Sequence, residues 1–138
     1  MKNMFVFCIS VAAVVATSVT MAGGHMMAVS AGNQDVSGGT VTASMVMSEA
    51  NGWLVIHRTD DSGKPGPVVG HAPLKKGENI DVVAILTEAV ASGDKLMVML
   101  HGETGGMKTG IFEYTLGAKE DGPVKKDGKL VMSIITAK

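Results

Sequence analysis

The chain has 138 residues, of which 46% are apolar and 18% are charged, and its 12 Lys and Arg residues nearly balance its 13 Asp and Glu residues. This length suits a single domain, and the near-neutral, evenly mixed charge argues against nucleic-acid binding and against a polybasic membrane anchor. The only cysteine is Cys8, so the chain beyond it can hold no disulfide, thiolate nucleophile or cysteine-ligated metal.

Residues 1–22 have the pattern of a cleaved export signal. Lys2 provides the positive start, residues 4–19 form an apolar run, and the small residues Thr20 and Ala22 suit signal peptidase. A run of about 16 apolar residues falls short of the ~20 that a membrane-spanning helix needs, so cleavage is favoured over an uncleaved anchor. We therefore expect a signal peptide over 1–22, a mature domain over 23–138 without a stable membrane span, and a periplasmic, secreted or cell-surface location.

Beyond the signal, short apolar runs alternate with clusters of Gly, Pro, Asn and Asp, and no stretch keeps a helical period for three turns. This pattern predicts an all-β domain. The expected strands are 26–31, 40–47, 53–58, 67–71, 79–86, 95–101, 111–115 and 129–136. Residues 88–91 could form one helical turn.

Two of the expected strands are apolar on both faces, which is typical of central strands in a sheet. They lie at 53–56 and 96–100. In 40–47 the residues alternate, and we expect one face to carry Val41, Ala43, Met45 and Met47. Seven or eight short strands, roughly evenly spaced, favour a single β-sandwich of immunoglobulin-like or cupredoxin-like outline over a barrel.

Four sequence pieces carry a family resemblance. They are Gly52-Trp53-Leu54-Val55-Ile56-His57, Pro67-Val68-Val69-Gly70-His71-Ala72-Pro73-Leu74, Leu96-Met97-Val98-Met99-Leu100-His101, and Asp121-Gly122-Pro123-Val124 leading to Asp127-Gly128. Residues 52–138 resemble a domain family of unknown function that is common in exported and haloarchaeal surface proteins. The resemblance implies export and a β-sandwich, and it implies no activity. Many family members carry acidic residues after the histidine of the third piece, where this chain has Gly102-Glu103.

Cleavage after Ala22 would create an amino terminus of Gly23-Gly24-His25. Such a terminus offers a free α-amine, two amide nitrogens and an imidazole, which is the planar four-nitrogen set that Cu(II) and Ni(II) prefer. Met26 and Met27 follow and add thioethers that suit Cu(I). The alternative is a terminus that binds no metal.

His57, His71 and His101 share a context, because each ends an apolar run just before a turn or a proline. If the three meet at one rim of the sandwich, they would form a three-nitrogen site for zinc or copper with an open position. Met97 and Met99 fall on the same strand face as His101. The alternative is that each ring hydrogen-bonds the backbone at a strand end and that the methionines fill the core.

Sequence signatures of enzymes are missing: there is no Gly-x-Ser-x-Gly elbow, complete phosphate loop or calcium loop. The sequence predicts a non-enzymatic exported binding or structural module, with copper as its small partner and an envelope or surface protein as a further candidate partner. The main alternative is a structural or protein-interaction domain without metal. A small histidine-ligated metalloenzyme is the third reading.

Overall fold

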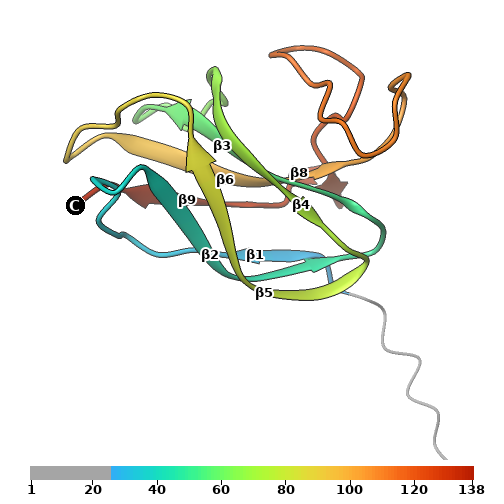
Figure 1. Cartoon of the computed structure of the whole chain (residues 1–138), viewed down its shortest axis with the longest axis horizontal. Helices are drawn as coiled ribbons and strands as arrows, with labels where there is room; N and C mark the ends of the chain where they lie inside the picture. The colour runs from blue at the N-terminus through green and yellow to red at the C-terminus, as the bar shows by residue number, and fades with distance from the viewer. Residues whose placement is uncertain (1–25) are drawn as a thin grey trace, which may run out of the picture.

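The structure is a computed structural model that describes residues 26–138 (Figure 1). The predicted export signal and Gly23-Gly24-His25 lie outside the described residues. The described residues contain nine strands and no α-helix, which confirms the all-β prediction. The strands are β1 (Ala28–Ser30), β2 (Thr40–Ser48), β3 (Gly52–Thr59), β4 (Val68–Leu74), β5 (Gly77–Leu86), β6 (Lys95–Gly102), β7 (Lys125–Lys126), β8 (Lys129–Leu130) and β9 (Met132–Thr136).

Seven of these strands form one antiparallel sheet in the order β1-β2-β5-β4-β3-β6-β9, and β7 and β8 form a small hairpin. The sheet folds over, so that β1, β2 and β5 face β3, β6 and β9 across the interior (Figure 1). β4 joins the two layers, because it pairs with β3 over most of its length and with β5 only at Gly70 and His71. This is the strand order of an immunoglobulin-type sandwich.

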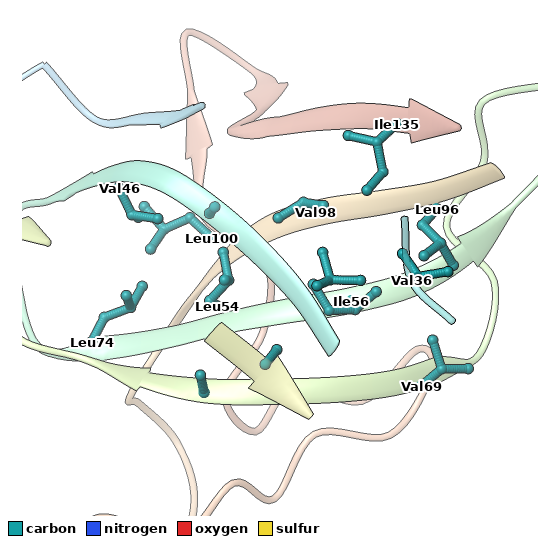
Figure 2. Close-up of a cluster of buried hydrophobic side chains, with 14 of the residues drawn as sticks. Val36, Val46, Leu54, Ile56, Val69, Leu74, Leu96, Val98, Leu100 and Ile135 are labelled. Carbon is teal, nitrogen blue, oxygen red and sulfur yellow. The ribbon is translucent and has the colours of Figure 1, made fainter. Parts of the chain in front are cut away.

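The main hydrophobic core lies between the two layers (Figure 2). Leu54 and Ile56 of β3 and Leu100 of β6 point into it, and Val46 of β2 approaches from the opposite layer. All four side chains are 0% exposed. Full burial of an aliphatic side chain stabilises a fold by about 1.5–3 kcal/mol, so these alternating residues fix which face of β3 and β6 points inward.

The other faces of β3 and β6 are buried as well. Val55, His57, Met97 and Met99 are 0% exposed, although they point away from the main core. The prediction that these two strands are central is therefore confirmed. This second buried face carries His57 and His101.

Several local expectations were wrong. Residues 111–115 form no strand, residues 88–91 form no helical turn, and the expected strand 129–136 is divided into β8 and β9. In β2 the buried residues are Val41, Ala43, Val46 and Ser48 rather than Met45 and Met47. The alternation changes phase around Ser44. In β5, Asp81 lies between the partners of Ala43 and Met45 and has a positive φ of 50°.

Within residues 26–138, no helix has the length and apolar character needed to cross a membrane.

Candidate metal centre

His57 and His101 come from neighbouring strands and meet inside the protein. In the antiparallel register of β3 and β6, Trp53 pairs with His101 and His57 pairs with Met97, so both histidines project from the same face. Their rings extend toward each other along the strands, with centroids 5.2 Å apart and planes inclined by 29°. The two Nε2 atoms are 3.1 Å apart, and both residues are 0% exposed.

The other ring nitrogen of each histidine is bound to a backbone carbonyl. Nδ1 of His57 donates to the carbonyl of Gly66 at 2.8 Å, and Nδ1 of His101 donates to the carbonyl of Asp121 at 2.6 Å. A carbonyl oxygen only accepts hydrogen bonds, so each neutral ring must carry its proton on Nδ1. Both Nε2 atoms are then left with lone pairs that point toward a shared position.

Two lone pairs at this separation repel each other unless an electrophile lies between them. A proton on one ring would turn the contact into a hydrogen bond, and a metal ion would turn it into coordination. Burial lowers the pKa of His57, and burial lowers the pKa of His101 to about 4. Both shifts disfavour a doubly protonated, charged ring at neutral pH.

Residues 103–124, which we term the covering segment, lie over the histidine pair. Tyr114 packs edge-on against both rings, with centroid distances of 5.8 Å to His57 and 4.6 Å to His101. Phe112 lies 6.1 Å from the His101 ring. These aromatic side chains exclude water from the pair and keep its surroundings apolar.

Asp121 anchors the covering segment and is itself 0% exposed. Its carboxylate accepts hydrogen bonds from the backbone N–H groups of Thr104 at 3.1 Å and Glu113 at 2.9 Å, while its carbonyl holds His101. In the sequence, Asp121 stands out only as part of a family-resemblance piece, so this anchoring role was not predicted. The one available signal was the following Gly122, since an Asp-Gly pair is typical of tight turns in which Asp adopts a positive φ, here 45°.

His71 does not join the pair. It lies on β4, is exposed, and stacks on Phe112 at a centroid distance of 4.5 Å. Phe112 also contacts His101 and so stands between the two histidines. Across residues 26–138, no three His, Cys, Asp or Glu side chains lie close enough to hold one metal ion. The predicted rim site of His57, His71 and His101 is therefore replaced by a buried pair, because His57 and His101 lean inward along their strands.

Met97, Met99 and His101 do share one face of β6, as the sequence predicts. The candidate copper terminus of Gly23, Gly24 and His25 lies outside the described residues.

A surface pocket of about 520 Å³ lies beside Trp53. Its lining includes Asn51, Lys75, Asn79 and Glu103, and it contains none of the three histidines. Nε1 of Trp53 is buried without a hydrogen-bond partner among residues 26–138.

A family model described as a domain of unknown function (DUF7282) matches residues 27–138. No curated protein and no solved structure matches the chain. The family resemblance drawn from residues 52–138 is confirmed at the level of a domain of unknown function, and the match extends to all nine strands. The chain belongs to this family, the DUF7282 domains of unknown function.

Proposed function

We propose that this chain is an exported, non-enzymatic β-sandwich module that binds one copper ion between His57 and His101. The observation that carries the proposal is the 3.1 Å separation of two Nε2 atoms whose rings are already anchored through Nδ1. Anchored ligands lose little conformational entropy when a metal binds. The hydrogen bond from Nδ1 also fixes the tautomer in which Nε2 is free to bind the metal. Export rests on the signal predicted over residues 1–22.

Copper is favoured over zinc by the number of ligands. Zinc sites in proteins use at least three protein ligands, whereas the described residues hold no such group of His, Cys, Asp and Glu. Imidazole nitrogen also binds copper well, and the order of divalent affinities places copper above zinc. The complete burial of both rings supports a binding role rather than an enzymatic one, because a site this enclosed leaves no room for a substrate beside a bound ion.

The competing function is a structural or protein-interaction domain without metal. In that case a proton occupies the position between the two Nε2 atoms, and the pair serves to join β3 to β6 beneath the covering segment. The two functions differ in one measurable property, which is whether the pair retains copper.

Native mass spectrometry of the purified exported protein tests the proposal. We expect a mass that starts at Gly23 and one retained copper ion in a His25→Ala variant, in which the amino-terminal motif lacks its imidazole. In that background, His57→Ala and His101→Ala should each lose the ion, whereas His71→Ala, on the exposed ring outside the pair, should keep it. Far-UV circular dichroism confirms that each variant is folded. Absence of copper from the folded His25→Ala protein would contradict the proposal.

A further inference from the structure

The register of β3 and β6 places a sulfur-bearing residue, Met99, between the strand positions of the two histidines. Between the Trp53–His101 pair and the His57–Met97 pair lies the pair of Val55 and Met99. Because the rings approach each other along the strands from both sides, they meet over this middle pair. Met99 projects from the same face as both histidines and is 0% exposed.

The spacing of the two nitrogens leaves room for a further ligand. With metal–nitrogen bonds of about 2.0 Å, a separation of 3.1 Å corresponds to a nitrogen–metal–nitrogen angle of about 100°. Two ligands alone would favour a linear arrangement, with the two nitrogens on opposite sides of the ion and about 4 Å apart at the same metal–nitrogen bond length. The bent arrangement leaves one side of the ion open to a third donor, and Met99 is the sulfur-bearing residue whose strand position lies between those of the two histidines.

The surroundings of the histidine pair favour one oxidation state of copper over the other. Val55, Met97 and Met99 are 0% exposed and Tyr114 is 8% exposed, so an ion here is removed from water. The nearby carboxylate of Asp121 is committed to two backbone N–H groups of the covering segment. Neutral ligands leave the full charge of the ion uncompensated, and burying two charges costs much more than burying one. Thioether and imidazole ligands also suit the soft monovalent ion.

We infer that the site is selective for Cu(I), which is held by Nε2 of His57, Nε2 of His101 and the thioether of Met99. This inference rests on the proposed copper function and adds its third ligand and its oxidation state.

Anaerobic Cu(I) titration against a chromophoric competitor tests the inference, with Cu(II) and Zn(II) titrations alongside, all in the His25→Ala background. Met99→Leu should weaken Cu(I) binding by about tenfold or more, because the loss of a ligand that contributes about 1.4 kcal/mol of binding free energy already corresponds to a factor of ten. Met97→Leu is the matched control, because Met97 shares the strand, the face and the 0% exposure of Met99. Leu is close to Met in volume, so both variants should fold. X-ray absorption should show copper–sulfur scattering that only Met99→Leu removes.

The outcomes separate the two proposals. Equal Cu(I) affinity in Met99→Leu and Met97→Leu, with copper still dependent on both histidines, would remove Met99 from the site and leave the copper function standing. Tighter binding of Cu(II) or Zn(II) than of Cu(I) would overturn the oxidation-state assignment. Binding of neither form of copper would overturn the copper function itself.

Discussion

At the level of single residues, Asp121 determines how the covering segment sits on the histidine pair. It uses three acceptor atoms at once: two carboxylate oxygens for backbone N–H groups at either end of a loop, and a carbonyl for His101. It does so in a left-handed conformation with φ of 45°, which Asp and Asn tolerate better than other non-glycine residues. One residue thus links the loop's own conformation, through its side chain, to the orientation of a candidate ligand, through its backbone carbonyl.

Asp121→Ala should lower the free energy of unfolding by roughly 3 kcal/mol, because hydrogen bonds to a charged acceptor contribute about 1.5–3 kcal/mol each and two partly buried N–H groups lose their partner. Asp121→Asn should cost less, since the amide keeps one acceptor oxygen and tolerates the same φ. Glu120→Ala, at the exposed neighbouring position, is the control and should change little. Urea unfolding gives all three values. Equal stability of Asp121→Ala and Glu120→Ala would show that the segment does not depend on Asp121.

The candidate site could be predicted only in part from its residues. His57 and His101 stood out because each ends an apolar run, but the same pattern also selected His71. A pattern of two-residue alternation assigns a side chain to a face and does not say how far it leans along the strand. The meeting of His57 with His101 depends on that lean and on the register between β3 and β6, which local sequence does not encode.

At the level of elements, β3 and β6 are the pair on which the site depends. They are in register over all eight positions, from Gly52 opposite Gly102 to Thr59 opposite Lys95. Both-face apolar character identified these two strands from sequence. The covering segment was harder to predict, because Phe112 and Tyr114 suggest a strand although their backbone forms a loop. Its conformation follows from long-range contacts, chiefly the hydrogen bonds to Asp121 and the edge-on packing of Tyr114 against the histidines.

Gly52→Ala tests the close approach of β3 to β6. A Cβ at Gly52 would lie 2.3 Å from the carbonyl oxygen of His101, and that backbone atom cannot move without displacing the strand. We expect a loss of at least about 2 kcal/mol of unfolding free energy, as for other overpacked sites. Gly32→Ala is the matched control, because nothing lies within 4 Å of its Cβ position. Thermal unfolding of the two variants at equal concentration measures the difference, and equal melting temperatures would contradict the close approach.

At the level of the whole molecule, the two edges of the sheet lie close together. Gln34 and Ala137 form an isolated parallel bridge, the N–H of Lys138 donates to the carbonyl of Gln34, and the N–H of Thr136 donates to Oδ1 of Asn33. The sequence predicted the sandwich class and most strand positions, because these follow from local alternation and turn residues. It could not predict this closure, since the partners lie 103 residues apart for Thr136 and Asn33 and share no local pattern.

The buried histidine pair makes the free energy of unfolding depend on pH in the acid range. The direction of that dependence distinguishes a pair bridged by a proton from a pair whose Nε2 lone pairs are both free. In the unfolded chain both histidines titrate near pH 6.5, whereas burial lowers the pKa of His57 and lowers the pKa of His101 to about 4. The groups that face His101 are the His57 ring, which lowers its pKa further, Tyr114, and Asp121, which opposes the shift. Between these pH values the unfolded state binds more protons than the native state.

The unfolding free energy of the metal-free protein should therefore be highest above pH 6.5 and should fall as the pH is lowered toward 4, with a loss of about 3 kcal/mol from His101 alone. Denaturant unfolding at half-unit pH steps with a chelator present measures this curve. His101→Gln should flatten it, because the titrating group is gone, whereas His71→Gln should leave most of the slope. A rise in stability below pH 6 would mean instead that the native pair takes up the proton more readily than the unfolded chain. The electrophile between the two Nε2 atoms would then be a proton, and the metal would have to displace it.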